Sequence, residues 1–327
     1  MHIEVSKEHG PEKVTMAAAY ANAVLELMKI NPKVMELEAD LARSLLGGDI
    51  IEEMQNNHPN QYLDCGIQEA NMMSVAAGLS AMGRIPFIHT FAAFASRRIA
   101  DQVFISGTYS HASVRIVASD PGVTSQFNGG THMPFEDVAI YRAYPGMIIL
   151  DPTDSTMLKN LIPQIADNKN MYYIRLFRKN AVKVYEEGST FEVGKAALLR
   201  NGCDVTIFAS GCVMVPEALK AAELLQQEGI EARVMDMFTI KPLDREAVIK
   251  AAQETGAIVT AENHNVINGL GSAVADVLAT EVYAPLEKIG VQDCLGEVGP
   301  LDYLKKTFGL TALDIAAAAK RAISRKK

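Results

Sequence analysis

The chain has 327 residues, which is enough for two domains that each bury a hydrophobic core. Its composition, with 49% hydrophobic and 21% charged residues and no tryptophan, is that of an ordinary globular protein. A formal net charge of −8 argues against non-specific binding to nucleic acid or to an anionic membrane, although a few local arginines can still hold a small anionic substrate. The sequence has no run of 18 apolar residues, so we expect no membrane-spanning helix.

Two further features predict a cytoplasmic protein. The first residues, MHIEVSKEHGPEK, lack the apolar stretch of a secretory leader. The cysteines are widely spaced and form no CxxC pair, which favours free thiols over disulfides or structural zinc; they are Cys65, Cys203, Cys212 and Cys294.

Helices and strands alternate along the first half of the chain. The predicted helices cover 14–30, 67–82, 91–106, 134–144 and 155–166. The predicted strands cover 34–39, 84–90, 113–118, 147–150 and 171–176. Strands separated by helices at this spacing predict βαβ units and a parallel sheet covered on both faces.

A charged, turn-rich stretch at 181–193 interrupts this alternation before a second α/β set begins. In the second set we predict strands at 205–209, 232–236, 257–261 and 287–292, and helices at 215–228, 244–254, 271–281 and 311–323. The predicted fold class is α/β, with two consecutive doubly wound domains, mostly parallel sheets and helices on both faces. We place the domains at 1–185 and 186–327.

Candidate ligand-binding segments lie where the predicted strands of the first domain end, because parallel sheets bind ligands outside their carboxyl edge. They are 40–44, 91–98, 119–136 and 175–178. Glu69 instead opens a helix, where the helix dipole favours an ionised acid, and an ordinary first-turn glutamate is the alternative interpretation.

The loop SDPGVTSQFNGGTHMPFED is the most unusual stretch of the sequence. Its three glycines let a ligand approach the backbone closely. His132 precedes Pro134, which we expect to start a helix, so the imidazole is placed to bind or move a proton at a substrate hydroxyl. A purely structural loop histidine is the alternative.

Two other patterns carry less information about function. The turn GLGSA at 269–273 resembles a phosphate cradle, but glycine-assisted entry into a helix is the favoured interpretation. The His, Asp, Glu and Cys residues show no metal-ligand spacing, so we expect this chain to contribute no metal ligand.

Several segments together resemble one family across nearly the whole chain: EADLARS, GIQEANM, HTFAAFASRR, NGGTHMPFED, MFTIKPLD and ENHNVINGLGSA. In this order and spacing they are similar to the C-terminal, pyrimidine-binding part of transketolase, in the split form where this part is a separate subunit. The resemblance implies an enzyme that uses thiamin diphosphate (ThDP) to transfer a two-carbon ketol unit from a ketose to an aldose phosphate. It also implies that this chain supplies half of a cofactor site.

The half of the cofactor site that this chain lacks is the part that binds the diphosphate. The chain has no GDG motif of the kind that holds diphosphate and metal in this family. The resemblance therefore implies a partner, the N-terminal transketolase subunit, that binds the diphosphate and Mg²⁺, and an α2β2 heterotetramer as the assembly.

The resemblance assigns cofactor roles to individual residues. Glu69 matches the glutamate that hydrogen-bonds the aminopyrimidine ring, Phe94 matches the ring that stacks on it, and Phe91 matches an aromatic of the same pocket. Asp40 matches an acid near the cofactor, and Arg97 stands where a third aromatic is often found.

The resemblance assigns substrate roles as well, with departures. His132 matches the histidine that contacts sugar hydroxyls, and Arg178 and Ser44 match residues that hold the distal phosphate. Ser119 replaces a histidine at the start of the substrate loop, and Asn128 replaces an acid.

A further departure lies in the first helix, where Ala17 stands in place of a phosphate-binding arginine. Together with Ser119, this change implies a donor with a different anionic end, or a branched or modified sugar. Three alternatives remain: a β subunit of a 2-oxo acid dehydrogenase E1 component, a 1-deoxyxylulose-5-phosphate synthase, and a non-catalytic regulatory paralogue. The segment THMPFED and the FGLT near the end favour transketolase.

Overall fold

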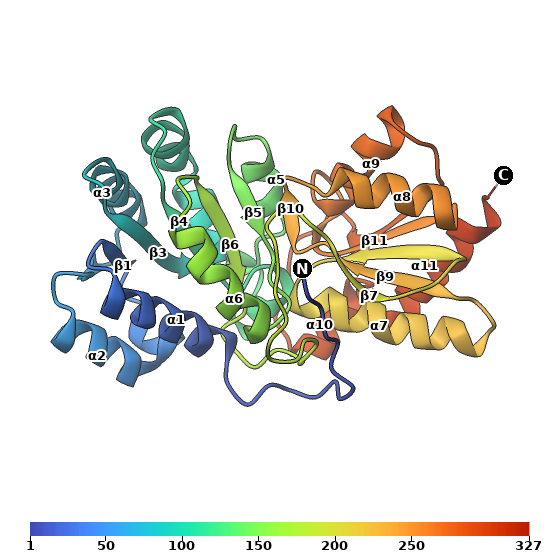
Figure 1. Cartoon of the computed structure of the whole chain (residues 1–327), viewed down its shortest axis with the longest axis horizontal. Coiled ribbons are helices and arrows are strands. Elements are labelled where there is room, and N and C mark those ends of the chain that lie inside the picture. The colour runs from blue at the N-terminus through green and yellow to red at the C-terminus, as the bar shows by residue number, and fades with distance from the viewer. Residues whose placement is uncertain (327) are drawn as a thin grey trace.

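The chain forms two sheets side by side, each covered by helices (Figure 1). This computed structural model describes residues 1–326. The first sheet has seven strands in the order β10-β5-β6-β4-β3-β1-β2, and all neighbours pair in parallel except the β10–β5 pair. The strands are β1 (Val34–Glu38), β2 (Tyr62–Asp64), β3 (Ile85–Phe91), β4 (Arg115–Ser119), β5 (Ile148–Leu150), β6 (Tyr172–Leu176) and β10 (Thr239–Lys241).

Two hydrophobic clusters cover the faces of this sheet. On one face pack α1 (Met16–Ile30), α2 (Gly48–Asn57) and α6 (Ser155–Ala166). The other face is covered by α3 (Glu69–Ala81), η2 (Phe94–Arg98), η3 (Val103–Tyr109) and α5 (Asp137–Arg142). The sequence explains the ends of α1, because the side chain of Thr15 caps its first turn and Asn31 before Pro32 stops it.

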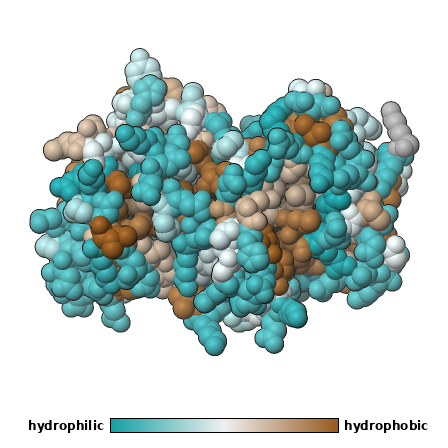
Figure 2. All heavy atoms as spheres, in the orientation of Figure 1, coloured by the Kyte–Doolittle hydropathy of each residue, from teal (hydrophilic) through white to brown (hydrophobic). Residues whose placement is uncertain are grey.

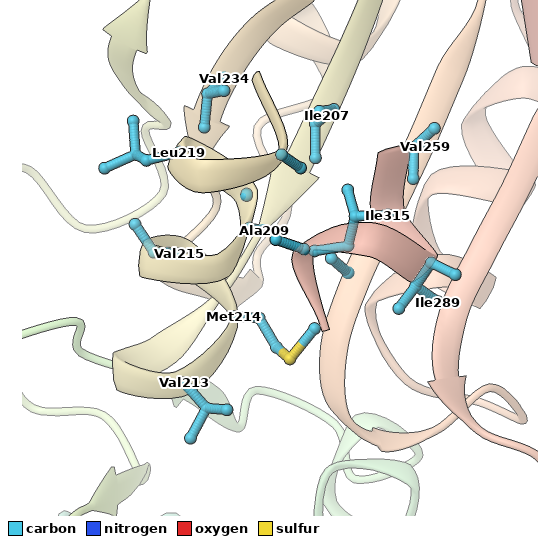
Figure 3. Packing of buried hydrophobic residues seen from close by; sticks show 14 of the residues in the cluster. Ile207, Ala209, Val213, Met214, Val215, Leu219, Val234, Val259, Ile289 and Ile315 are labelled. Carbon is cyan, nitrogen blue, oxygen red and sulfur yellow. The ribbon is translucent and has the colours of Figure 1, made fainter. Parts of the chain in front are cut away.

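The second sheet has five strands in the order β12-β11-β8-β9-β7, and only the β7–β9 pair is antiparallel. Its strands are β7 (Ala197–Arg200), β8 (Val205–Ala209), β9 (Ala232–Asp236), β11 (Ile258–Asn265) and β12 (Leu286–Val291). Helices α7 (Gly211–Gln227) and α11 (Ala312–Ser324) cover one face, where Met214 and Ile315 meet Ile207 and Val259 (Figure 3). Helices α8 (Arg245–Thr255) and α9 (Leu270–Thr280) cover the other.

The predicted fold class is confirmed, and most differences concern short or irregular elements. Three short strands, β2, β7 and β10, and the short helix α10 (Leu301–Thr307) were not predicted, because three to seven residues give little periodicity. The ten-residue helix α2 was also missed, because it starts at the Gly47-Gly48 pair, which is typical of a break. The predicted helix 91–106 is instead broken into the π-helical η2, a short α4 (Ala100–Gln102) and the π-helical η3. The predicted helix 134–144 begins later, at Asp137.

The two sheets are joined by more than the connector between them. Strand β10 comes from the second half of the chain but pairs with β5 of the first sheet. The N-terminal arm runs along the connector, forming bridges from His2 to Thr190 and from Val5 to Tyr185, so the N-terminus lies between the two sheets (Figure 1). The domain boundary near residue 185 stays a prediction.

The surface has the mostly polar character expected from the composition of the chain. Figure 2 shows a face that is mostly hydrophilic, with apolar residues in separate groups. No helix among the described residues is long and apolar enough to cross a membrane. The four cysteines are free.

Candidate active site

Glu69 is the first residue of α3, and its side chain is 2% exposed. Its two carboxylate oxygens accept hydrogen bonds from Nη1 of Arg98, at 2.8 and 2.7 Å. The arginine side chain is 45% exposed, so it covers the acid from the solvent side. A buried carboxylate is thus paired with one half-exposed cation.

Three rings lie beside this ion pair. Phe94 and Phe91 meet edge to face with centroids 5.9 Å apart. The imidazole of His132 packs edge-on against both, at 5.2 Å from Phe94 and 5.7 Å from Phe91. The guanidinium carbon of Arg98 lies 4.0 Å above the ring of Phe94.

The local helix geometry explains this arrangement. Phe94 and Arg98 begin and end η2, four residues apart, so their side chains lie on the same side of one wide turn. The segment HTFAAF delivers Phe91 at the end of β3 and Phe94 at the start of that turn.

The loop 120–136 is held from the second half of the chain. The buried side chain of Asn263, in β11, accepts a hydrogen bond from the backbone N–H of Val123 at 2.9 Å and donates one to the carbonyl of Pro121. Gly122 has a φ of +56°, and a Cβ there would lie 2.2 Å from the Asn263 side-chain oxygen, so only glycine fits. Another contact joins Gly130 to Gly296, where a Cβ on Gly130 would lie 2.5 Å from the Gly296 carbonyl.

Arg178 and Asp120 form an ion pair at the carboxyl ends of β6 and β4. The Nε of Arg178 lies 2.8 Å from Oδ2 of Asp120, and its backbone N–H donates to Oδ1 of the same acid. Burial raises the pKa of Asp120 to about 6, against the lowering effect of Arg178. The guanidinium carbon of Arg178 lies 5.7 Å from the ring centroid of Phe91.

Deeper in the sheet, Ser119 belongs to a buried polar chain. Nε2 of His89 lies 2.5 Å from the Ser119 hydroxyl, and Nδ1 of His89 lies 2.8 Å from Glu38. Burial lowers the pKa of His89 to about 4, so its imidazole is neutral near pH 7, and burial raises the pKa of Glu38 well above its ordinary value. A neutral imidazole carries one N–H, so His89 donates to one of these two neighbours and accepts from the other.

Most of the predicted site residues come together here. Contacts link Glu69, Phe94, Phe91, His132 and Arg178 through the rings and Arg98. Arg97 joins them indirectly, since its Nη2 donates to the carbonyl of Thr131 at 2.8 Å and its Nε pairs with Glu136 at 3.0 Å.

Other predicted residues stand apart from the rings. Asp40 is exposed just beyond β1, with a φ of +61°, and the hydroxyl of Ser44 donates to the carbonyl of Leu41. Ser119 is fully buried, while the buried amide nitrogen of Asn128 has no hydrogen-bond partner among the described residues. His132 lies on a short 3₁₀ turn, Gly130–His132, rather than at the start of a helix as expected, because α5 starts at Asp137.

Sequence reasoning missed Arg98, Asp120 and the pairing of Glu38 with His89. The signal for Arg98 was its spacing of four residues from Phe94 in a segment read as an ordinary helix. The pairing of Glu38 with His89 depends on the register of β1 against β3, which places them opposite each other.

Two predictions concern a metal site and the GLGSA turn at 269–273. No group of three or more His, Cys, Asp or Glu side chains within residues 1–326 could hold a metal ion. The turn at Gly269 receives the carboxylate of Glu262, which accepts hydrogen bonds from the N–H groups of Leu270 and Gly271. Burial raises the pKa of Glu262 to about 7. A protein carboxylate therefore fills the position that an anion would take, and the favoured interpretation of GLGSA as a helix entry agrees with this geometry.

Two domain models of one family match most of the chain. The model of the transketolase pyrimidine-binding domain matches residues 12–183, and that of the transketolase C-terminal domain matches residues 194–315. The chain belongs to the transketolase family. The predicted resemblance to a split transketolase subunit is confirmed by its relatives.

These relatives match this transketolase-family chain over nearly their full length. The 6-deoxy-6-sulfo-D-fructose transketolase subunit SqwH of Clostridium sp. (strain MSTE9) is 49% identical, over 94% of this chain and 94% of the relative. A putative transketolase C-terminal section of Methanocaldococcus jannaschii is 39% identical, over 92% and 94%. A solved split-gene transketolase, described as an inactive beta4 tetramer, superposes with a TM-score of 0.88 at 40% identity, over 96% of this chain and all of that one.

Proposed function

We propose that this chain is the pyrimidine-binding subunit of a split, ThDP-dependent transketolase that moves a two-carbon ketol unit from an anionic ketose to an aldose phosphate. The observation that carries the proposal is that Glu69 and Phe94 already hold a flat, cationic group, the guanidinium of Arg98, between a carboxylate and an aromatic face. An aminopyrimidine ring needs the same two partners. When bound, ThDP supplies a nucleophilic carbon and an electron sink for the two-carbon fragment.

The residues of this chain would prepare that cofactor in distinct ways. Glu69 would hydrogen-bond a pyrimidine ring nitrogen from a dry position, since it is 2% exposed. Phe94 would stack on the ring, and Phe91 would fix the orientation of Phe94 from the side. Arg97, in η2, and Asp40, from beyond the end of β1, would approach the bound cofactor.

His132 would act on the substrate. Its ring lies against Phe91 and Phe94, so it faces the same pocket as the cofactor ring. Thr131 lies within hydrogen-bonding distance of Nδ1, at 2.9 Å, which orients the imidazole. Nε2 is then available to bind or move a proton at a sugar hydroxyl.

The other half of the cofactor site would come from a partner. Mg²⁺ and the diphosphate would be held mainly by an N-terminal transketolase subunit, as the lack of a GDG motif in this chain implies. Two copies of each chain would make an α2β2 assembly. The beta4 tetramer of the 40% identical protein, described as inactive, is consistent with this dependence.

For the donor, we propose a ketose that ends in a sulfonate. The Clostridium relative is named for 6-deoxy-6-sulfo-D-fructose. A sulfonate carries one negative charge, whereas a phosphate monoester carries about −1.5 to −2 at pH 7. The resemblance expects basic residues at Ala17 and Ser119, and both positions are fully buried, so we centre a site for the smaller charge on Arg178.

Two kinds of side chain could donate hydrogen bonds to the donor sugar. Arg178 can present two N–H groups to a tetrahedral anion. The unpartnered amide nitrogen of Asn128 can donate to a sugar hydroxyl. Ser44 would contact the anion from the π-helical turn η1 (Arg43–Gly47), which follows β1.

The experiment compares donors with the complex of this chain and its diphosphate-binding partner. With D-glyceraldehyde 3-phosphate as acceptor, kcat/KM should be at least about tenfold higher for 6-deoxy-6-sulfo-D-fructose than for D-fructose 6-phosphate. The Arg178→Ala variant should lose more activity with the sulfonate donor than with uncharged L-erythrulose. A preference for the phosphate donor would overturn the sulfonate assignment. Decarboxylation of pyruvate without ketol transfer would point to a 2-oxo acid dehydrogenase, and absence of both reactions to a non-catalytic paralogue.

A further inference from the structure

One arginine occupies the two groups that the proposed function assigns to the pyrimidine ring. Arg98 uses Nη1 to contact both oxygens of Glu69, and the same guanidinium lies 4.0 Å above Phe94. A heterocycle that stacks on Phe94 and hydrogen-bonds Glu69 needs the volume that this guanidinium fills. The other surroundings of Phe94 are taken by Phe91 and His132, which pack on it edge-on.

We propose that Arg98 is a placeholder for the pyrimidine ring: it closes the half-site in the chain without cofactor, and ThDP binding displaces it. This inference rests on the proposed function. Arg98 would therefore be a positioning residue that sets the affinity for the cofactor rather than a group that takes part in the chemistry.

The charge of Glu69 explains why a placeholder is needed. An ionised carboxylate that is 2% exposed is costly to bury without a cation or several hydrogen bonds. A subunit that is made separately from its partner has to fold before the cofactor site is complete. The guanidinium supplies the missing charge, and its flat shape allows it to lie on an aromatic face as a heterocycle would.

The environment of Arg98 also allows it to leave. Its side chain is 45% exposed, and its residue ends η2, where Ile99 has left the helical conformation with a φ of −113°. Arg115, by contrast, is 1% exposed and donates to the backbone carbonyls of Ile165 and Ala166, so it is fixed in place. The two arginines differ in the way expected for a movable and a structural side chain.

A placeholder reduces the apparent affinity for ThDP, because only the fraction of molecules with Arg98 displaced can bind. Removing it should therefore tighten binding. In the complex with the diphosphate-binding partner, we expect the Kd of ThDP at saturating Mg²⁺ to fall by about threefold to thirtyfold in Arg98→Ala. The Arg98→Gln variant, which keeps a long side chain without the charge, should show the same direction of change, so that a folding defect in one variant does not decide the result.

Arg245→Ala is the matched control, because Arg245 and Glu281 form an exposed ion pair in the second half of the chain, with side chains 52% and 43% exposed. Its Kd for ThDP should equal that of the wild type. A second readout uses the free chain: 4-amino-5-hydroxymethyl-2-methylpyrimidine, titrated by ligand-observed NMR, should bind Arg98→Ala more tightly than the wild type.

An unchanged or weaker Kd in both Arg98 variants would overturn the placeholder role. That outcome leaves the proposed function standing, because the wild-type complex would still bind ThDP. Failure of the proposed function looks different: the wild-type complex and both variants would bind no ThDP, which overturns the placeholder as well.

Discussion

Glu69 and Glu38 lie in the same domain and are both buried, but they differ in what neutralises them. Glu69 meets the guanidinium of Arg98 at 2.7 and 2.8 Å. Glu38 ends β1 beside neutral His89, and its second oxygen has no hydrogen-bond partner within the described residues. Burial, together with the nearby charge of Asp64, therefore raises the pKa of Glu38 well above its ordinary value. A ligand can therefore replace Arg98 at Glu69 from the solvent side. Glu38 and His89 are both fully buried, so their contact is structural.

The largest expected effect is the difference in kcat between variants of Glu69 and of Glu38. Glu69→Gln should lower kcat of the complex by about 10²- to 10⁴-fold, because the amide cannot exchange a proton with the pyrimidine ring. Glu38→Gln should lower kcat less than about tenfold, because the Gln amide can keep the hydrogen bond to His89 either as donor or as acceptor. Steady-state ketol transfer measures both. Equal losses in the two variants would contradict the distinction.

A smaller effect is expected from the aromatic partner of Glu69. Phe94→Leu keeps an apolar side chain but removes the stacking face, so the Kd of ThDP should rise by about tenfold. Calorimetry on the complex measures this change, and the exposed Arg245→Ala variant serves as a control. Unchanged affinity in Phe94→Leu would mean that this ring is not the cofactor's stacking partner.

The smallest effect concerns stability and pH. The pKa of Glu38 is raised in the folded chain, so the native state holds a proton that the unfolded chain releases above the ordinary value of 4.5. Its contribution to stability is present below that pH and is lost as the pH rises. Glu38→Gln removes this loss, so its free energy of unfolding, relative to wild type, should increase between pH 5 and 8. Urea unfolding across this range tests the sign, and a relative decrease would show that Glu38 is ionised in the folded chain.

The same comparison shows what the sequence could predict. The alternation of strand and helix segments predicted most long elements but not α2, and 205–209, 232–236 and 155–166 agree with the observed bounds of β8, β9 and α6. Glu69, Phe91, Phe94 and His132 were placed in one pocket by family resemblance, and the structure brings their side chains together. What was missed depends on register and on backbone winding. The pairing of Glu38 with His89 follows from the alignment of β1 with β3. The spacing of four residues could have placed Arg98 beside Phe94, but its contact with Glu69 depends on how the π-helical turn packs against α3.

The central claim is that this chain holds the pyrimidine half of a ThDP site that another chain completes. The most direct measurement is calorimetric titration of ThDP·Mg²⁺ into this chain alone, into the diphosphate-binding partner alone, and into their mixture, with wild-type and Glu69→Ala forms of this chain. We predict tight binding only in the wild-type mixture and at least about tenfold weaker binding in the Glu69→Ala mixture. Equal affinity in the isolated chain and in the mixture, or full affinity and ketol transfer in the Glu69→Ala mixture, would contradict the claim.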